Sequence, residues 1–566
     1  MVKGLFKAVS LGLCILMLSS VTACKQTNTG TKETASEASA GDTAVGTTEA
    51  AKADPFGKYT PAITLTSVRT LDSNVKFDTS KPTQKSLTEN VWATAYQEKL
   101  GITFDYLWTT TTEQYDAKWN VTIASGDLPD CALLSSPASG VIYKQLVKGG
   151  YVQDMTKIYN DYASDMYKKG NEEDGGVTLS YMTFDGKLMG LPVIGTTPDG
   201  VNFLFIRQDW LQKVNMPEPK TMDEVVKVAK AFQQAQLGGK DTYGICMNKQ
   251  FNAGQHDMLG FFNSFGAYYH MWIKDAASGG LVYSSIQPAM RTALLKLQEM
   301  YRDGIINQDF AVKDASTAAQ DVTAGKVGML YGQFWAPAIG AMPGMEKDTS
   351  AVWVPVIPPT SDGSTYVSQV SATPTQFVFV NKNCKNPEAV VKALNLNLKL
   401  ESEDTINYSN NGKDSVDLFM YRFCPSIWMP WKNLNSHIAI VDAIKAGDAS
   451  KLSTSDKAWY DEITNGLASD STAYNKTMNL IYGEKSCYSY INEFKNNNQI
   501  LPDAYQALPT DTMLAKETTL KAALDVAMQK VIMGADISLF DDAVSAWKKG
   551  GGDAITSEVN AWYATK

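Results

Sequence analysis

Strand and helix patterns alternate along the chain from about residue 60, and this alternation is the feature that most restricts its fold. Residues 63–66 and 102–108 alternate in the way of half-buried strands, and residues 131–134 form a short apolar run. Residues 92–100 and 115–123 place aromatic and aliphatic side chains at helical spacing, and glycine closes each helix. The order strand, helix, strand, helix, strand predicts a parallel sheet with right-handed crossovers.

The same alternation continues to about residue 400. Further strands are predicted at residues 203–206, 327–331, 352–356 and 377–380, and helices begin near Asp209, Thr221, Pro288 and Asn386. After about residue 405 the pattern is mostly helical. With 566 residues, of which 44% are apolar, the chain can bury a large core without disulfides. The sequence therefore predicts an α/β protein with a mostly helical C-terminal part.

The first 57 residues have the pattern of an export signal followed by a tether, not of a folded domain. Lys3 and Lys7 precede a short apolar stretch, which ends in Val-Thr-Ala before Cys24. This end resembles the lipobox of bacterial lipoproteins, and the resemblance implies cleavage before Cys24 and lipid on its sulfur. Residues 24–57 are rich in Thr, Ala, Gly, Ser and Glu, so we expect a flexible tether. No later apolar run approaches 18 residues, so no transmembrane helix is expected.

Charge and cysteine content exclude several classes of protein. Lys plus Arg number 51 against 60 acidic residues, a net charge of −9, which is unsuited to nucleic acid. Only three histidines are present, far apart, and nothing in their spacing supports a metal site or a catalytic triad. Five cysteines remain after Cys24, in no CxxC arrangement and odd in number, so at least one is unpaired within the chain. We interpret most of them as small buried hydrophobes.

Four short stretches stand out together, although no one of them is specific alone: ASGDLPD at 124–130, IRQDWL at 206–211, AGKVGM at 324–329 and KNPEA at 385–389. In this order they resemble one known family, the extracellular solute-binding lipoproteins of bacterial carbohydrate ABC importers. The resemblance implies a periplasmic-binding-protein-like fold, in which two α/β lobes joined by a hinge close on a ligand in the cleft between them. It also implies a carbohydrate ligand, delivery to the importer's permease subunits, and no catalytic activity.

The resemblance gives a domain plan, in which the chain crosses between the lobes more than once. Our plan is a signal peptide at 1–23, a tether at 24–57, lobe 1 at 58–190 and 352–400, lobe 2 at 195–350, and a helical part at 401–566 packed mainly on lobe 2. Carried to the whole protein, it places a monomer on the outer face of the cytoplasmic membrane, held by the lipid on Cys24. We expect no cofactor.

One departure from the family concerns calcium. Some oligosaccharide-binding relatives hold Ca²⁺ in a loop rich in Asp and Asn. The matching stretch here, residues 236–244, has Asp241 as its only acid. Because Ca²⁺ takes six to eight oxygen ligands, we expect this site to be absent and predict no metal.

A sugar site needs flat aromatic surfaces and polar side chains, and the sequence offers several candidates. Each candidate has an equally ordinary structural explanation, as a core aromatic or as one half of a salt bridge. The candidate ligand-binding residues are Trp335, Trp108, Arg207, Tyr268, Tyr269, Trp272, Trp428 and Trp431. Trp92 and Trp119 lie on helical stripes and are expected in the core instead.

Trp335 is the strongest of these candidates. The predicted strand at 327–331 leads into Gly332, so the side chains just beyond it should face the cleft. The Trp335 ring would then cover one face of a sugar, and we expect its N–H to be free for a hydroxyl. Arg207 also ends a strand and would reach a hydroxyl or carboxylate by the same reasoning.

Two other classes remain open at this point. A lipid-anchored glycoside hydrolase needs a pair of carboxylates in a cleft, and sequence cannot exclude one among 60 acids, although no motif indicates it. A surface adhesin or structural lipoprotein usually shows repeats, and none occurs beyond the tether.

Overall fold

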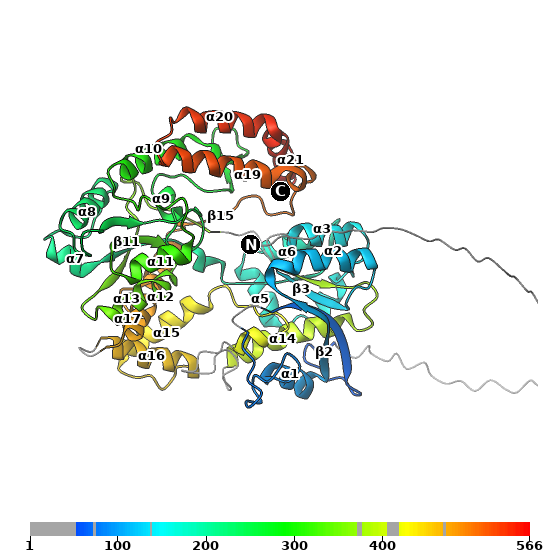
Figure 1. The fold of residues 1–566 in the computed structure, drawn as a ribbon. Coiled ribbons are helices and arrows are strands. Elements are labelled where there is room, and N and C mark those ends of the chain that lie inside the picture. The colour runs from blue at the N-terminus through cyan, green and yellow to red at the C-terminus, as the bar shows by residue number, and fades with distance from the viewer. Residues whose placement is uncertain (1–52, 72–74, 136–138, 371–375, 404–417, 468–470) are drawn as a thin grey trace, which may run out of the picture. The chain divides into compact units, whose positions relative to one another are not determined.

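The computed structural model of the protein describes residues 53–71, 75–135, 139–370, 376–403, 418–467 and 471–566. The predicted signal peptide, Cys24 and almost all of the tether lie outside these residues. The described part contains mixed α/β structure followed by helices (Figure 1).

Buried side chains gather in separate hydrophobic clusters, and these define two lobes. One cluster, from Leu65 to Ile194 and from Phe377 to Ile427, forms the core of what we call lobe 1. The others draw on residues 201–370 and 434–559 and form lobe 2. Trp92 and Trp119 are fully buried in lobe 1, which confirms their assignment to the core.

Lobe 1 begins with the predicted strand and helix alternation. Strand β1 (Ile63–Thr70) pairs in parallel with β2 (Ile102–Thr110), and Gly101, with φ +66°, ends the helix between them. The remaining elements follow in chain order: α1 (Val91–Ala95), η1 (Tyr96–Leu100), η2 (Thr112–Gln114), α2 (Tyr115–Ser125), β3 (Cys131–Ser135), α3 (Ser139–Lys148), α4 (Thr156–Tyr162), α5 (Asp165–Glu173), α6 (Val177–Met182), β4 (Thr183–Phe184), β5 (Lys187–Leu188), β6 (Leu191–Pro192), β14 (Gln376–Val380), α14 (Pro387–Glu403) and η6 (Leu418–Tyr421).

The predicted parallel pairing is confirmed for β1 and β2 but is wrong for β3. In lobe 1, β14 lies between β3 and β6 and is antiparallel to both. The partner of β3 is thus not a neighbour in sequence. It is β14, which the chain reaches only after passing through lobe 2. Local periodicity predicts the strands correctly, but it carries no information about this distant partner.

Lobe 2 is built on a four-stranded sheet in the order β12, β7, β11, β8. Strand β11 is parallel to β8 and antiparallel to β7, and β7 is antiparallel to β12. The elements up to residue 370 are η3 (Thr197–Gly200), β7 (Phe203–Arg207), α7 (Gln208–Lys213), α8 (Met222–Gln234), β8 (Tyr243–Cys246), α9 (Leu259–Asn263), β9 (Trp272–Lys274), β10 (Leu281–Tyr283), η4 (Ser284–Ile286), α10 (Pro288–Arg302), α11 (Ala315–Thr323), β11 (Val327–Gly332), α12 (Ala336–Ile339), α13 (Ala341–Lys347), β12 (Trp353–Val356) and β13 (Ser368–Val370).

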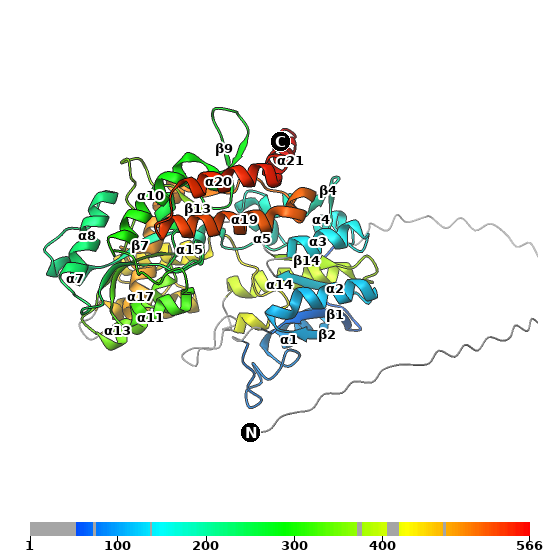
Figure 2. The same ribbon diagram turned by 45° about the horizontal axis from the view of Figure 1, so that its top comes forward.

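The C-terminal part is mostly helical, as predicted, and Figures 1 and 2 show α19 running beside α10. Its short strand β15 pairs in parallel with β13. Its elements are α15 (Lys432–Ala446), α16 (Thr454–Gly466), α17 (Ala473–Tyr482), α18 (Cys487–Asn496), β15 (Ile500–Pro502), α19 (Asp511–Ile532), α20 (Ser538–Trp547), η7 (Lys548–Gly552) and α21 (Asp553–Tyr563).

Two segments lie in a different lobe from the one in our plan. Strand β12 pairs with β7 and so joins the sheet of lobe 2, not lobe 1. Residues 418–427 contribute Leu418, Tyr421 and Cys424 to the core of lobe 1, not lobe 2. In both cases the chain crosses between the lobes later than in our plan, because a crossing leaves no signal in the local strand and helix pattern.

The chain passes between the lobes at three places. The first crossing, residues 194–202, joins β6 to β7, the second joins β13 to β14, and the third leads from η6 to α15. Residues 505–511 form a further link, because Leu508 belongs to the core of lobe 1 and the Tyr181 hydroxyl donates to the carbonyl of Tyr505 at 2.9 Å.

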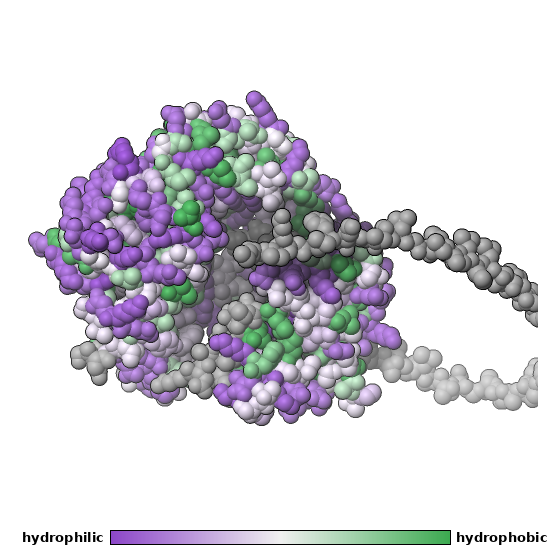
Figure 3. All heavy atoms as spheres, viewed as in Figure 1, coloured by the Kyte–Doolittle hydropathy of each residue, from purple (hydrophilic) through white to green (hydrophobic). Residues whose placement is uncertain are grey.

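Figure 3 shows that hydrophilic residues cover most of the face viewed, with hydrophobic residues in small patches. Among the described residues, no helix combines the length and hydropathy that crossing a membrane requires. The five cysteines that follow Cys24 are all buried and unpaired, which confirms their interpretation as small hydrophobes: Cys131, Cys246, Cys384, Cys424 and Cys487.

Candidate functional site

Two adjoining cavities lie where the chain crosses between the lobes. Cavity 1 has a volume of about 460 Å³ and cavity 2 of about 560 Å³, and both are bordered by Thr196, Thr197 and Val370. The rest of cavity 1 is Asp199, Gly200, Asn252, Leu259, Gln333, Phe334, Trp335, Gln369, Trp428, Lys432 and Asn433. The rest of cavity 2 is Glu173, Asp174, Val177, Thr178, Val193, Gly195, Pro198, Gln376, Ser426, Pro430, Trp431, Phe494, Lys495, Asn498, Ile500 and Pro502.

All three crossings contribute to these walls. Residues 195–200 come from the first crossing, Val370 and Gln376 flank the second, and Ser426 to Asn433 belong to the third. Mixed aromatic and amide side chains of this kind suit a ligand with apolar faces and many hydroxyls. The volumes fall in the usual range for small-molecule sites.

Trp335 lies in the wall of cavity 1, just beyond the end of β11, where the sequence placed it. Gly254 packs against its ring: Gly254 has φ +76°, and a Cβ there would lie 2.6 Å from the Trp335 Cζ2. The indole N–H is not free, since it donates to Gln333 Oε1 at 2.8 Å, so that expectation is wrong. The bond leaves the Gln333 amide nitrogen, rather than the indole, as the donor for a ligand.

Trp428 and Trp431 lie on the third crossing and line different cavities. Trp428 borders cavity 1, and its backbone N–H donates to the carbonyl of Ile194 on the first crossing at 3.0 Å. The Arg422 guanidinium lies 4.3 Å from the centre of its ring. Trp431 borders cavity 2, with the Lys495 ammonium 4.0 Å from its ring centre. These contacts hold both indoles in position from within the protein.

The acidic group of cavity 1 is Asp199, which the sequence reasoning missed. Its Oδ2 accepts from Asn433 Nδ2 at 2.7 Å, so this bond joins the first and third crossings. Burial raises the pKa of Asp199 to about 6, although the bond from Asn433 acts in the opposite direction. The stretch Thr-Thr-Pro-Asp-Gly at 196–200 has the composition of an ordinary turn, and only its place in the walls of the cavities makes it a candidate site.

Gln369 connects cavity 1 with one of the predicted residues. Its side chain accepts from the backbone N–H of Tyr269 at 2.6 Å and donates to the Tyr269 carbonyl at 2.9 Å. The Tyr269 hydroxyl itself donates to Asp525 at 3.0 Å. Tyr269 therefore holds a wall residue in place and does not line either cavity.

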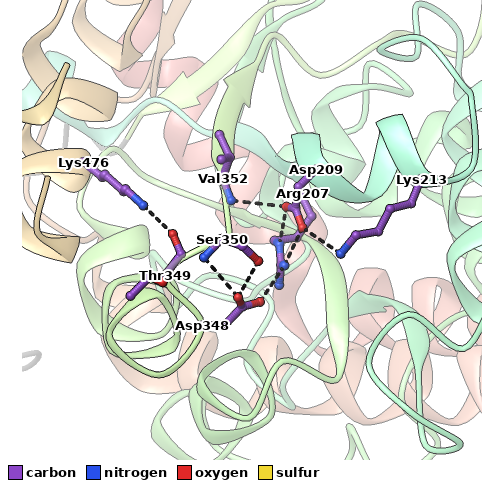
Figure 4. Close-up of polar contacts among 8 residues, drawn as sticks. All are labelled: Arg207, Asp209, Lys213, Asp348, Thr349, Ser350, Val352 and Lys476. Atoms are coloured by element: carbon purple, nitrogen blue, oxygen red, sulfur yellow. Dashed lines mark hydrogen bonds and ion pairs between the residues drawn. The ribbon is translucent and has the colours of Figure 1, made fainter. Parts of the chain in front are cut away.

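Arg207 lies away from both cavities, contrary to expectation. Figure 4 shows its guanidinium facing Asp209 and Asp348, with distances of 2.7 Å to both Asp209 oxygens and 3.1 Å to Asp348 Oδ2. The reason is strand direction. Because β7 runs antiparallel to β11, Arg207 at the end of β7 lies at the opposite edge of the sheet from Gly332.

The remaining candidates also serve the protein's own packing. Trp108 donates its Nε1–H to Thr122 at 3.0 Å and meets Trp119 edge to face at 6.0 Å. Trp272 is 3% exposed and belongs to the hydrophobic cluster under the C-terminal helices. Tyr268 is half-buried and borders neither cavity.

The loop in which some relatives hold calcium is closed here by a hydroxyl. Thr242 Oγ1 accepts from the backbone N–H of Gly238 at 2.8 Å and donates to the Gly239 carbonyl at 2.5 Å. Within the described ranges, no group of three or more His, Cys, Asp or Glu side chains is arranged to hold a metal ion.

Comparison of the sequence with known proteins finds two relatives in Bacillus subtilis. Lipoprotein LipO of Bacillus subtilis is 24% identical over 467 residues, which are 79% of this chain and 84% of LipO. The polygalacturonan/rhamnogalacturonan-binding protein YtcQ of the same organism is 28% identical over 241 residues, 42% of this chain and 45% of YtcQ.

A solved structure agrees in fold. The ABC-transporter substrate-binding protein FusA of Streptococcus pneumoniae, in complex with kestose, superposes with a TM-score of 0.57 at 16% identity, over 89% of this chain and 100% of that one. The family model for the bacterial extracellular solute-binding protein matches residues 79–396, more than half of the 566 residues. This chain therefore belongs to the bacterial extracellular solute-binding protein family.

Proposed function

We propose that this protein is the substrate-binding lipoprotein of an ABC importer and captures a carbohydrate in cavities 1 and 2. The observation that carries the proposal is the combination of side chains in the wall of cavity 1. There Trp335 and Trp428 supply aromatic surfaces, while Asp199, Asn252 and Asn433 supply hydrogen-bonding groups. A sugar ring needs this combination, since it presents apolar C–H faces bordered by hydroxyls.

A binding screen tests the proposal directly. Mono- and oligosaccharides are added to the purified protein, and its melting temperature and tryptophan fluorescence are recorded. A ligand at 100 times its dissociation constant should stabilise the folded state by about 2.7 kcal/mol. Trp335 and Trp428 should report binding by a change in emission. If no saccharide changes either signal, the carbohydrate assignment fails.

The ligand should draw the lobes together, because both cavities are bordered by all three crossings. Closure then reports occupancy to the permease. Small-angle scattering should give a smaller radius of gyration with saturating ligand than without it. An unchanged radius at saturation would mean a rigid site and would contradict the hinge.

We also propose that the protein is a monomer held on the outer face of the membrane by lipid on Cys24. Two acyl chains anchor firmly, since each buried methylene contributes about 0.8 kcal/mol. Cys24→Ala should release the protein to the medium or leave the precursor uncleaved. Retention of this variant at the membrane, with no lipid on the mature wild-type N-terminus by mass spectrometry, would contradict the anchor.

If the protein only binds sugar, it should release the sugar without cleaving it. Incubation of labelled oligosaccharides with the protein, followed by chromatography, should return only the starting material. Shortened products would favour a hydrolase that uses two carboxylates of the cavity walls.

A further inference from the structure

We infer that the cavities select an uncharged saccharide, and that Asp199 is a residue that sets this selectivity. The inference rests on the proposed function and narrows its substrate class: sugars that carry carboxylate groups, such as oligouronates, are excluded.

The first argument is the engagement of every arginine. Arginine is the side chain best suited to binding a carboxylate, because its planar fork makes two parallel hydrogen bonds. The chain has only five arginines, and each already binds a group of the protein. Their partners are the Met420 and Arg422 carbonyls for Arg69, Asp209 and Asp348 for Arg207, Asp541 for Arg291, Asp303 for Arg302, and Glu401 for Arg422.

The second argument concerns the lysines in the walls. Lys432 borders cavity 1, but its ammonium lies 3.3 Å from Glu401 Oε1 and 5.0 Å from the centre of the Trp428 ring. Lys495 borders cavity 2, where it lies over Trp431. A ligand carboxylate drawn to Lys495 would also meet Glu173 and Asp174, which line the same cavity.

The third argument is the position of Asp199. It is 8% exposed in the wall of cavity 1, and Asn433 donates to its Oδ2. Lys432 is the only other ionisable side chain that borders this cavity among the described residues, and its ammonium faces Glu401, which also binds Arg422. A carboxylate entering here would face a like charge in a poorly solvated site, where repulsion is strong. A sugar hydroxyl, in contrast, would donate to Asp199 in a charge-assisted hydrogen bond.

The test uses matched pairs of saccharides that share a linkage and differ only at C6. α-1,4-Galactotriose is compared with α-1,4-trigalacturonate, and β-1,4-mannotriose with β-1,4-trimannuronate, beside neutral fructans and glucans. Binding is measured at pH 7 by tryptophan fluorescence and calorimetry. We expect neutral saccharides to bind, and each uronate to bind at least roughly tenfold more weakly than its neutral partner. The affinity for the neutral saccharide should change little between low and high salt, because screening acts on charged pairs.

The Asp199→Asn variant tests the residue itself. Asn can still accept from Asn433, so the local structure should persist, but the charge is lost. The affinity for the best neutral saccharide should fall by roughly 10- to 100-fold. Asp105→Asn, an exposed acid on β2, is the matched control and should leave the affinity unchanged.

The outcomes separate the two hypotheses. Tight binding of a uronate overturns the inference and leaves the carbohydrate function standing. Binding of neutral saccharides with no loss in Asp199→Asn overturns the role of Asp199. If no saccharide of either kind binds, the proposed function fails and the inference fails with it.

Discussion

The sheet of lobe 2 has two opposite edges at which its strands end, one where β7 ends at Arg207 and one where β11 ends before Trp335. Both edges carry aromatic and polar residues, but the polar groups have different surroundings. At one edge, Arg207 meets Asp209, with Trp210 and Trp353 within 6.0 Å of its guanidinium. At the other edge, Trp335 follows the end of β11 in the wall of cavity 1. The first edge also borders a cavity, of about 280 Å³, but its charges are paired with one another. The second edge presents aromatic and polar surface to the larger cavity 1. Residue type alone therefore does not identify a binding edge.

The pKa values of the carboxyl groups follow the same contrast. Burial would raise the pKa of Asp209, but hydrogen bonds and charge from Arg207 hold it below its usual value. Burial raises the pKa of Asp199 to about 6, because its bond from Asn433 does not compensate. The pKa of Asp199 is therefore set mainly by burial, whereas that of Asp209 is set mainly by its charged partner.

The largest expected effect is at the structural edge. Arg207→Ala should lower the free energy of unfolding by about 3–5 kcal/mol, because it removes the buried guanidinium that packs on Trp210 and leaves Asp209 with the exposed Lys213, 3.5 Å away, as counter-ion. Urea denaturation measures this loss. The folded fraction should bind saccharide with unchanged affinity. A loss of affinity without a loss of stability would move Arg207 into the binding site and erase the contrast between the edges.

Trp335→Ala probes the other edge and should show the reverse pattern. We expect a loss of about 2 kcal/mol in binding, or roughly thirtyfold in affinity, since an aromatic surface that the ligand would cover is removed. The melting temperature of the free protein should fall much less than for Trp92→Ala, a fully buried residue whose truncation costs about 3–5 kcal/mol. Unchanged affinity in calorimetry would make Trp335 a packing residue.

The sequence predicted the strands of both edges but not their directions. Trp335 could be located because a buried strand and the glycine after it are local features. Arg207 could not, because the antiparallel pairing of β7 with β11 joins residues more than a hundred positions apart. Asp199 was missed for a related reason: its turn becomes a cavity wall only when Asn433, on a distant crossing, binds it. The family resemblance supplied the two lobes, and local patterns supplied the elements within them.

A pH series compares the two carboxyl groups and should give a smaller effect. The folded pKa of Asp199, about 6, lies above the value near 3.9 of an unfolded Asp. Between pH 4 and 6 the folded state therefore binds more protons, so this group lowers the stability as the pH rises. Asp199→Asn should gain on the order of 1–2 kcal/mol relative to wild type between pH 4 and 7.

The carboxyl of Asp209 makes the stability depend on pH in the opposite direction. Its folded pKa is lowered, so its stabilising contribution is present at neutral pH and is lost as the pH falls through the folded value. Asp257 and Asp503 also have raised pKa values, but they cancel in the difference between Asp199→Asn and wild type. A difference that does not vary with pH would mean that Asp199 titrates normally.

The smallest effect should come from the outer member of the Arg207 network. Asp348 lies 3.1 Å from the guanidinium, but its side chain is 51% exposed, so water screens the pair. Asp348→Asn should therefore cost less than about 1 kcal/mol, because Arg207 keeps both bonds to Asp209. High salt should reduce even this loss. A cost near that of Arg207→Ala would show that Asp348, rather than Asp209, is the main counter-ion, and that the network at this edge depends on its exposed half.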